Sequence, residues 1–449
     1  MKKIFQYIML AVVTIVMASC TSDIEETTAT AGKSNVQLVV GEFPAFGDSQ
    51  TRAIGTPDEG KTSWAKGDEL LLEMTSKTLG TKYAAFTYNG SSWELASGEL
   101  SYKEDEVPTF PHVYYAPNYK WEAGKLVLKE GKVAGTDEYI EGKANITPNG
   151  QAITVKFAEA TRNYSRLRIA TLPNEQITVD TEYFTPAGSS DMEQEGNYTL
   201  TSDEKGNAYL YGTFENNSEV TVKYRGASLA THKFSKRTEN AKSYALDATV
   251  ISANSAEEIK SAIEQKVADG KTTIRLNLAP NAGTNEFMAI REAIKGAAPN
   301  DLGTIELTII GVETIPEEAF YKMLQLKSVR MSDVKEIKKY AFKECQYLTV
   351  VEAPSLNKLY SGAFKKCDQL SKLTFGPINY ADERNWPIFE YITPNIDLIL
   401  SDYQKEMIET DDYLYTANND RDYAGSDEHN SKNFLGREFK SITCRYPVE

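Results

Sequence analysis

Few side chains in this sequence have the types and spacing that metal binding requires. Asn418, Asp420 and Asp422 alternate in the way that the oxygen ligands of a calcium loop do. Tyr423, however, stands where such a loop has its turn glycine, and His429 stands where it has its closing glutamate. A solvated acidic loop therefore explains these residues better than a calcium site, and we expect no metal.

The candidates for catalysis are equally sparse. The three histidines, His112, His232 and His429, lie far apart in the sequence, which argues against a multi-histidine metal site or a histidine-driven hydrolase. The sequence shows no nucleophile–base pair and no phosphate-binding loop, so we expect a protein that is not an enzyme and needs no cofactor. Carboxylates paired only by folding are the remaining catalytic alternative. The 26 tyrosines could stack on sugars, but composition alone locates no sugar site.

Length, composition and charge narrow the class of protein. At about 150 residues per domain, 449 residues allow three domains. Hydrophobic residues make up 41% and charged residues 25%, which is typical of folded material and excludes wholesale disorder and a multi-span membrane protein. The net charge of −15 argues against a nucleic-acid partner, because such binding needs a basic face.

The first 19 residues indicate a secretory signal peptide. Lys2 and Lys3 are followed by the apolar run Ile8–Ala18, which is too short to span a bilayer. Ala18 and Ser19 then precede Cys20, and this arrangement resembles the lipobox of bacterial lipoproteins, although Met17 stands where that family prefers leucine. The resemblance implies cleavage before Cys20, acylation of Cys20, for example with palmitate, and a lasting membrane anchor. The alternative is an ordinary cleavable signal.

The residues after Cys20 bear on which side of the membrane the protein faces. The acidic run Thr21–Glu26 is similar to the export signal that sends lipoproteins of the Bacteroides type to the outer face of the outer membrane. Thr27–Ser34 is small and polar and is not expected to fold. We expect residues 20–35 to be a flexible tether whose lipid anchors the protein to the outer membrane. We expect the protein itself to face the extracellular side.

From Val36 to Val250 the dominant hydrophobic period is two, as in Ile153–Phe157 and Val220–Tyr224. This alternation is typical of strands with one buried face. Asn89-Gly90 predicts a hairpin. We predict two small antiparallel β-sandwiches, over residues 36–148 and 149–250.

Four short motifs in this region resemble the fimbrillin (Mfa-like) family of pilus proteins. They are Thr51-Arg52, Ser63–Leu70, Val113–Pro117 and Lys242–Leu246. The resemblance implies two transthyretin-like sandwiches and polymerisation by strand addition between pilus subunits. Arg52 matches a position where some pilins are cut by an arginine-specific protease, which would release the leading strand; a surface arginine on a loop is the alternative. A large domain at the C-terminal end departs from a stalk pilin and favours a tip-like or non-polymerising subunit.

A helical pattern begins after residue 252. Ser255–Glu258 has the form of a capping box, and Gly270 is suited to end the helix that follows. Further segments predict a strand over Thr273–Leu278, a helix over Phe287–Ile294 and a strand over Thr304–Ile310. We expect these elements to cover the open edge of the repeats that follow.

The last third repeats itself every 22 residues. The recurring positions are Ile315, Ile337 and Leu359; Ala319-Phe320, Ala341-Phe342 and Ala363-Phe364; Met323, Cys345 and Cys367; Leu326, Leu348 and Leu370; Val329, Val351 and Leu373. Such a period predicts an α/β solenoid, in which stacking closes a core that no single unit can close. The pattern closely resembles the BspA-type leucine-rich repeats of bacterial surface proteins. We assign residues 251–449 to this domain with its caps, and 312–377 to the full repeats.

Two strands are predicted at the C-terminal end of this domain. Asn395–Leu400 predicts a closing strand, and Leu435–Ile442 predicts a final strand that folds back.

The cysteines of the repeats allow two interpretations. Cys345 and Cys367 share a column, so a disulfide between them is one alternative. We expect two buried free thiols, because equivalent ladder positions point the same way. Cys444 has no explanation at this level.

Together these features predict a multidomain binding protein: two all-β sandwiches act as a spacer for a leucine-rich-repeat solenoid. The resemblances imply adhesion to host proteins, glycans or other bacteria. The alternatives are a minor or tip subunit of a fimbria and an accessory lipoprotein that captures glycans. The candidate binding face consists of the expected exposed strand positions, which are Ser328, Arg330, Val350, Glu352, Lys372 and Thr374.

Overall fold

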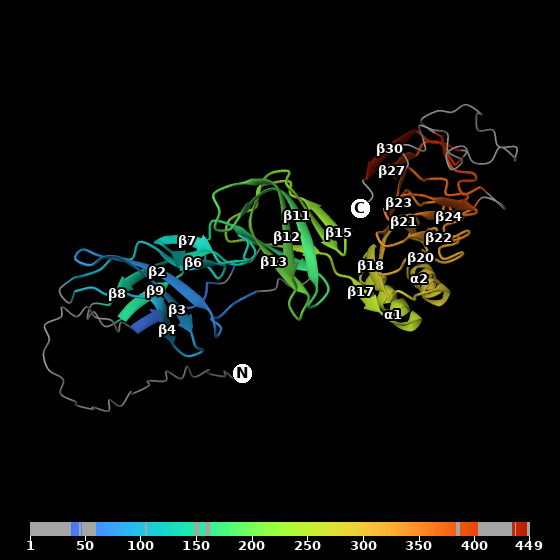
Figure 1. Cartoon of the computed structure of the whole chain (residues 1–449). Helices are drawn as coiled ribbons and strands as arrows, with labels where there is room; N and C mark the ends of the chain where they lie inside the picture. The colour runs from blue at the N-terminus through green and yellow to red at the C-terminus, as the bar shows by residue number, and fades with distance from the viewer. Residues whose placement is uncertain are drawn as a thin grey trace, which may run out of the picture.

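The computed structural model places three lobes in a row (Figure 1). Strands of the first lobe lie within residues 37–156, those of the second within 165–247 and those of the third within 251–446. The structure describes residues 37–44, 46, 60–103, 106–147, 152–157, 162–382, 387–402, 433–435 and 437–446. The predicted signal peptide, Cys20, Arg52 and the calcium-like residues lie outside the described residues.

One hydrogen-bonded path of seven strands, in the order β1-β9-β8-β5-β2-β3-β4, forms the main sheet of the first lobe. The strands are β1 (Gln37–Val40), β2 (Glu69–Ser76), β3 (Gly80–Tyr88), β4 (Trp93–Gly98), β5 (Val113–Tyr115), β8 (Ile140–Ile146) and β9 (Ala152–Lys156). A separate hairpin consists of β6 (Tyr119–Glu122) and β7 (Lys125–Leu128). The end strands β1 and β4 contact each other, so the sheet curls around a core that includes Leu70, Val113 and Ile153. The predicted Asn89-Gly90 hairpin is confirmed between β3 and β4.

The second lobe has the order β15-β14-β11-β13-β10-β16, with β12 paired to β11. Its strands are β10 (Ser165–Ala170), β11 (Gln176–Pro186), β12 (Glu193–Thr201), β13 (Asn207–Phe214), β14 (Glu219–Tyr224), β15 (Ala227–Lys233) and β16 (Ser243–Asp247). Val179, Leu210 and Val222 lie in its core. Along β14, burial alternates residue by residue, as the period of two in the sequence predicts.

The expectation of purely antiparallel sheets is wrong at one pair in each lobe. β1 runs parallel to β9, with Leu38 opposite Ile153, and β10 runs parallel to β16, with Leu167 opposite Tyr244. Parallel neighbours need a long crossover between them, and both pairs join strands far apart in sequence. Alternation within a strand shows which face is buried but does not show the direction of its partner.

The first two lobes are joined by a buried ion pair. Arg162 lies between them and donates from Nε and Nη2 to the two carboxylate oxygens of Glu138, at 3.1 and 3.0 Å. The Tyr164 hydroxyl donates to the same carboxylate at 2.5 Å, and Arg162 also donates to the carbonyl oxygen of Pro44 at 2.8 Å. The Arg162 guanidinium lies 4.0 Å from the ring centroid of Phe46. This network ties the segment after β1 to the start of the second lobe.

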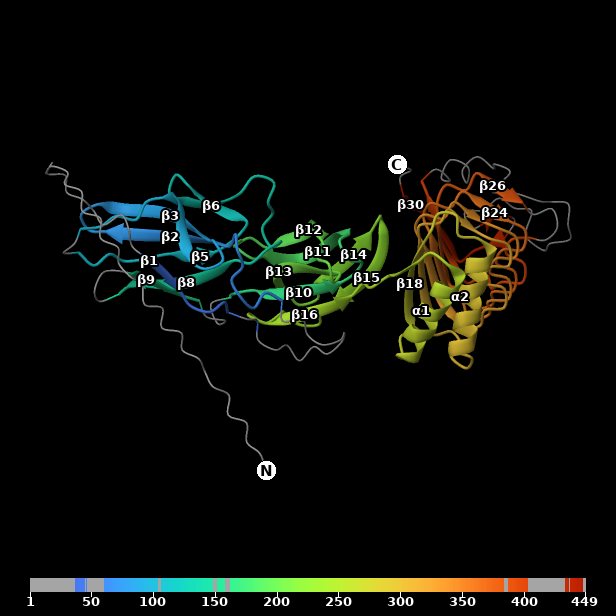
Figure 2. The ribbon, with the colours of Figure 1, turned by 90° about the horizontal axis from the view of Figure 1, so that it is seen from below.

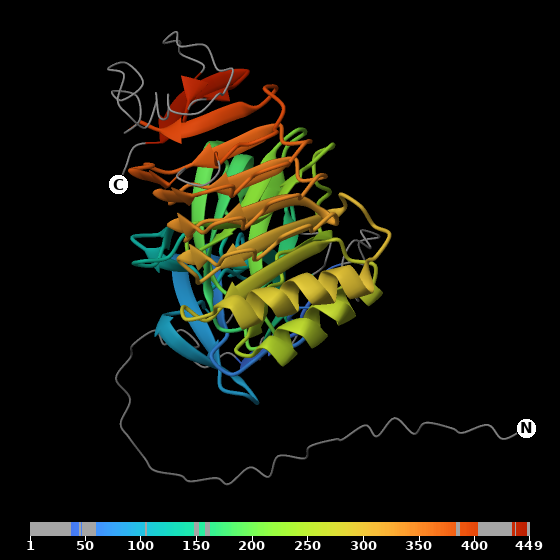
Figure 3. The ribbon, with the colours of Figure 1, turned by 90° about the vertical axis from the view of Figure 1, so that its right-hand side faces the viewer.

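Two parallel sheets make up most of the third lobe, with orders β17-β18-β19-β21-β23-β25-β27-β30 and β20-β22-β24-β26. The strands of the larger sheet are β17 (Ile251–Ala253), β18 (Thr273–Leu278), β19 (Ile305–Ile310), β21 (Leu326–Met331), β23 (Val350–Ala353), β25 (Lys372–Phe375), β27 (Asp397–Ser401) and β30 (Ser441–Tyr446). The smaller sheet contains β20 (Thr314–Ile315), β22 (Glu336–Ile337), β24 (Lys358–Tyr360) and β26 (Tyr380–Asp382). Figure 3 shows the strands of this lobe stacked in successive layers.

The register of both sheets follows the period seen in the sequence. Val329 lies opposite Val351, and Val351 lies opposite Leu373. In the smaller sheet, Ile337 lies between Ile315 and Leu359. Each repeating unit therefore gives one strand to each sheet, and its apolar column faces a common core.

Two helices lie at the start of this stack, beside the first strands (Figure 3). They are α1 (Ala256–Ala268) and α2 (Thr284–Ala297), so the second helix is longer than the sequence predicts. Ser255 caps α1, because its hydroxyl accepts from the backbone N–H of Glu258 at 3.3 Å. The Glu258 carboxylate accepts from the N–H of Asn254 rather than from that of Ser255, which modifies the predicted capping box. Neither helix is long and apolar enough to cross a membrane within the described residues.

The end of the larger sheet differs from the prediction. β27 is not its last strand, because β30 pairs with it in parallel on the side away from β25. The final strand begins at Ser441, and the residues before it form the small hairpin of β28 (Asn433–Phe434) and β29 (Arg437–Glu438). Phe434 and Phe439 are buried in the repeat core, so apolar burial anchors this hairpin to the repeats.

The third lobe docks on the second lobe, whose β15 end lies next to β18 in Figure 2. Ile310 packs into the core of the second lobe together with Ala248. Arg275 donates from Nε to the carbonyl oxygen of Leu229 and lies 4.0 Å from a carboxylate oxygen of Asp247. Burial works to raise the pKa of Asp247, but hydrogen bonds from Thr249 and nearby cations hold that pKa below its usual range. This contact fixes the position of the third lobe against the second, and the site described next lies between these two lobes.

Candidate functional site

The six residues of the predicted binding face do lie together on the larger sheet. Arg330, Glu352 and Thr374 follow one another across β21, β23 and β25, and Thr308 on β19 extends this row. A second row consists of Ser328, Val350 and Lys372. Positions two apart on a strand share a face, so the two rows form one surface.

Two members of the predicted face are not exposed. Ser328 retains only 4% of its accessible surface and Thr374 only 5%. Both side chains are short: Ser328 lies between Glu306 and Val350, and Thr374 lies between Glu352 and Ile399. At the strand spacing of about 4.8 Å, the longer neighbours cover them. The surface that a ligand could meet is therefore dominated by Arg330, Glu352 and Lys372.

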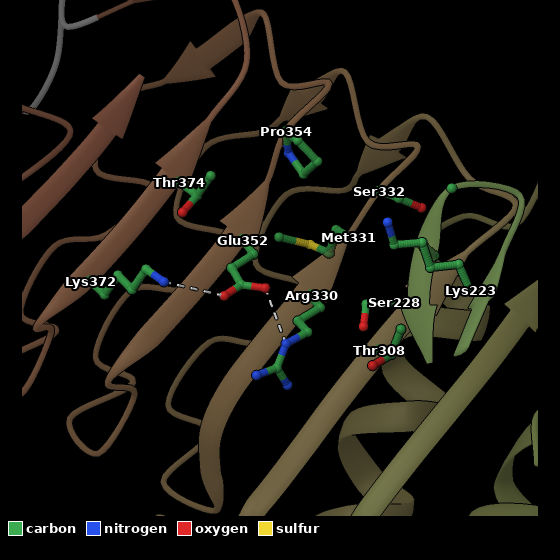
Figure 4. Close-up of a pocket in the computed structure, with 12 residues that line it drawn as sticks. Lys223, Ser228, Thr308, Arg330, Met331, Ser332, Glu352, Pro354, Lys372 and Thr374 are labelled. Carbon is green, nitrogen blue, oxygen red and sulfur yellow. Dashed lines mark hydrogen bonds and ion pairs between the residues drawn. The ribbon is translucent and has the colours of Figure 1, made fainter. Parts of the chain in front are cut away.

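A cavity of about 280 Å³ lies between this surface and the second lobe (Figure 4). Its lining combines strand residues of the third lobe with one turn of the second lobe. The lining residues are Lys223, Gly226, Ala227, Ser228, Thr308, Arg330, Met331, Ser332, Glu352, Pro354, Lys372 and Thr374.

The hairpin of β14 and β15 supplies the second-lobe side of the cavity. Tyr224 pairs with Ala227, so the turn contains only Arg225 and Gly226. Both have positive φ, +49° and +81°, as the two central residues of a type I′ turn require. A turn this tight brings Lys223 and Ser228 to the tip of the hairpin, at the cavity wall.

Charge within the cavity is mostly positive. Arg330 donates from Nε to Glu352 at 3.1 Å, and the Lys372 amine lies 3.9 Å from the other oxygen of that carboxylate. Figure 4 shows Glu352 between the two cations. Lys223 pairs with Asp180, which does not line the cavity, at 2.5 Å. The lining thus holds three cationic side chains and one carboxylate.

Several hydrogen-bonding groups in and under the cavity have no partner among the residues that the structure describes. The terminal Nη atoms of Arg330 donate to no residue that the structure describes. The hydroxyl of Ser332, which lines the cavity, and that of Ser328 are buried without a hydrogen bond among the described residues. Thr308 retains 3% of its surface and also lines the cavity. Buried polar groups are ordinarily satisfied, so an orphaned group at a cavity wall marks a place for a ligand atom or a water molecule.

The sequence alone missed part of this site. Lys223 and Ser228 lie about one hundred residues before the repeat strands and belong to a different lobe. The Arg225-Gly226 dipeptide next to the alternating run Val220–Tyr224 could have predicted the hairpin, but nothing in it indicates where the hairpin docks.

The arrangement is suited to binding. The lining contains no histidine or cysteine, and its one carboxylate is engaged by two cations. Within the described residues, no three His, Cys, Asp or Glu side chains gather where they could hold a metal ion. The cavity offers a ligand hydrogen bonds and charge, together with apolar contact from Ala227, Met331 and Pro354.

The repeat cysteines are structural. Cys345 and Cys367 are buried and form no disulfide, which confirms the prediction of free thiols. Their Sγ atoms donate to the carbonyl oxygens of Phe320 and Phe342, each at 3.0 Å. Burial raises the pKa of Cys345 to about 12 and that of Cys367 well above its usual value, so both thiols are protonated near neutral pH.

One family model matches part of the third lobe. Residues 302–396 match the profile of the BspA type leucine rich repeat region, in six copies. A crystal structure of a "putative cell adhesion protein" from Bacteroides fragilis is similar at 12% sequence identity and a TM-score of 0.26, covering 48% of this chain and 93% of that chain. No curated protein matches the chain by sequence. The chain therefore contains a BspA-type leucine-rich-repeat region.

Proposed function

We propose that this chain is a non-enzymatic recognition protein of the bacterial cell surface, an adhesin that binds a host or bacterial ligand. In this proposal the first two lobes are fimbrillin-like, transthyretin-like sandwiches that act as a spacer. The third lobe is a BspA-type solenoid that carries the binding surface. The BspA-type repeats at residues 302–396 support the surface role, because they resemble repeats of bacterial surface proteins.

The cavity between the second and third lobes is the observation that carries the proposal. It has hydroxyl groups that lack a hydrogen-bond partner among the described residues and an Arg330 guanidinium that is engaged only through Nε, and two lobes that are docked on each other build it. A site that exists before its ligand arrives loses little conformational freedom on binding. Its one carboxylate is engaged by two cations, and its lining holds no histidine or cysteine that could serve as a base or nucleophile.

Binding to an array of extracellular-matrix proteins and glycans tests this function. The purified full chain is compared with the double variant Arg330→Gln, Lys372→Gln. The matched control is Lys327→Gln, Lys335→Gln, which removes the same charge from two exposed lysines outside the cavity, each paired to a glutamate. We expect at least one array member to bind the chain and the control but not the cavity variant. An array that binds nothing, or a ligand that all three proteins retain, would contradict the proposal.

The anchor is a separate part of the proposal. The signal-like residues 1–19 and the small residues before Cys20 support a lipid anchor at the outer membrane, with the protein facing outward. Cells that express the chain should incorporate labelled palmitate into it, and Cys20→Ser should abolish the label. Protease added to intact cells should remove the protein if it faces outward. Label that persists in Cys20→Ser would rule out the anchor at this residue.

A second candidate function, a minor or tip subunit of a fimbria, is favoured by the position of β1. Among the described residues, this strand lies at the end of its sheet, pairs with β9 alone and buries Leu38. Its removal would open a place for another chain's strand. Stable multimers that appear after cleavage at Arg52, and not with Arg52→Gln, would support assembly. A monomer that persists after cleavage would argue against it.

A further inference from the structure

The geometry points to an acidic sugar residue, one bearing a carboxylate or a sulfate, as the ligand of the cavity between the second and third lobes. This inference rests on the proposed function and specifies its ligand class. Three features of the described residues support it: the unequal charges of the lining, its hydroxyl groups, and the lack of a free sheet edge or an aromatic pocket for a peptide.

The charges favour an anion. Glu352 is shared by Arg330 and Lys372, so it offsets at most one of them. Arg330 uses only Nε for this contact, which leaves the two terminal nitrogens of its fork for a second anion. Carboxylate and sulfate groups match such a fork, because two parallel N–H donors can bind two oxygens of one group. The net charge of the whole chain is −15, so this positive cavity is a local feature rather than a general property of the surface.

The remaining polar groups suit the hydroxyl groups of a sugar. Ser228, Thr308, Ser332 and Thr374 line the same cavity. A hydroxyl both donates and accepts, so these groups can pair with sugar hydroxyls in either sense. The Ser332 hydroxyl is buried without a partner among the described residues and would gain one.

The cavity offers little to a peptide. Peptides add to a free sheet edge, lie in an apolar groove or insert aromatic anchors into pockets. Strands β21, β23 and β25 are each paired on both sides, so the cavity presents no free edge. Its lining contains no aromatic residue. A volume of about 280 Å³ lies just below the range of about 300–1,000 Å³ that is typical of ligand pockets, and it suits one or two sugar units rather than a chain segment.

Glu352 affects how strongly the two cations can attract a ligand. It orients both cations, and it also keeps part of their charge from the ligand. Glu352→Gln preserves the shape of the side chain but removes its charge. If an anion binds beside Arg330, this variant should bind it more tightly, whereas a ligand that needs Glu352 as an acceptor should bind more weakly.

Titration calorimetry of the purified full chain tests the inference. The probes are 3′-sialyllactose, trigalacturonate and a sulfated chondroitin disaccharide, with lactose as the neutral match to sialyllactose. We expect at least one acidic probe to bind about tenfold more tightly than lactose, with an affinity that falls as salt rises. Arg330→Gln should weaken it about tenfold, Glu352→Gln should strengthen it severalfold and Lys327→Gln should leave it unchanged. Unchanged melting temperatures show that the variants are folded.

The outcomes separate the ligand class from the proposed function. Equal binding of lactose and sialyllactose, or weaker binding of acidic probes by Glu352→Gln, would overturn the acidic sugar while leaving recognition at the cavity intact. Absence of binding to any of these sugars, together with array binding to a host protein that Arg330→Gln abolishes, would do the same. Array binding that no cavity variant changes would overturn both.

Discussion

The ring of Phe342 lies almost parallel to the ring of Phe364, with centroids 5.4 Å apart and planes inclined by 6°. Phe320 continues the stack on the other side of Phe342, at 5.1 Å. These rings occupy one position of consecutive repeats, and all three are completely buried. The column joins neighbouring units in a core that no single unit could close.

Replacing Phe342 with alanine should therefore destabilise the repeats by about 3–5 kcal/mol, because it removes buried contacts on both sides and leaves a cavity. Hydrogen exchange of the amides in residues 302–396 measures the effect. Tyr391→Ala is the control, since 62% of that side chain's surface is exposed, and we expect a change within about 0.5 kcal/mol. Unaltered exchange in Phe342→Ala would show that the stack does not stabilise the repeats.

The buried pair of Arg162 and Glu138 leads to a prediction about the relative cost of a single and a double change. Glu138→Ala leaves the Arg162 guanidinium buried without its carboxylate, which should cost about 3–5 kcal/mol. Arg162→Met, Glu138→Leu removes both charges and should cost less than the single change. Calorimetric unfolding of the full chain gives the comparison. A double variant that is less stable than Glu138→Ala would contradict this account.

The docking of the third lobe on the second lobe should depend on Arg275. Arg275→Met removes the hydrogen bond to the Leu229 carbonyl and the charge near Asp247, and it should loosen the docking by about 1–3 kcal/mol. Small-angle scattering should show a larger radius of gyration, and proteases should cut more readily within residues 248–250. Arg237→Met is the control, because Arg237 is 57% exposed and pairs with Glu215 away from this contact. Identical scattering from both variants would count against a role for Arg275 in docking.

Stability should fall at alkaline pH because of the repeat thiols. The pKa of Cys345 is about 12 in the folded chain, above its ordinary value of 9.0, since burial disfavours the thiolate. The unfolded chain loses this proton first, so the free energy of unfolding should decrease between about pH 9 and 12 by about 1.4 kcal/mol per pH unit for each such thiol.

Chemical denaturation of Cys345→Ala and of the wild type across this range measures the difference. In the variant, the free energy of unfolding should decrease less steeply with pH, because one of the two thiols is gone. The Cys367 thiol should still contribute to the decrease. Below pH 8 the two slopes should coincide. Equal slopes at every pH would show that the Cys345 thiol does not have a raised pKa.

Local patterns determined much of the third lobe. The 22-residue recurrence of Val329, Val351 and Leu373 predicted their register, because a parallel ladder places equivalent positions of successive units side by side. The same recurrence predicted the buried free thiols. The Asn89-Gly90 hairpin followed from local turn chemistry, because its loop is only Asn89–Ser92 and the Asn89 side chain accepts from the backbone N–H groups of Ser91 and Ser92.

Contacts between segments far apart in the sequence could not be predicted from such local patterns. The parallel pairing of β1 with β9 and the burial of Ser328 and Thr374 depend on which strands and side chains become neighbours. The cavity is the clearest case, because it exists only where Lys223 and Ser228 of the second lobe meet the repeat strands. The sequence by itself determined which residues face a core and that Arg330, Glu352 and Lys372 share a face. Only the tertiary structure decided what covers that face, because docking depends on shape and charge matched across surfaces far apart in the chain.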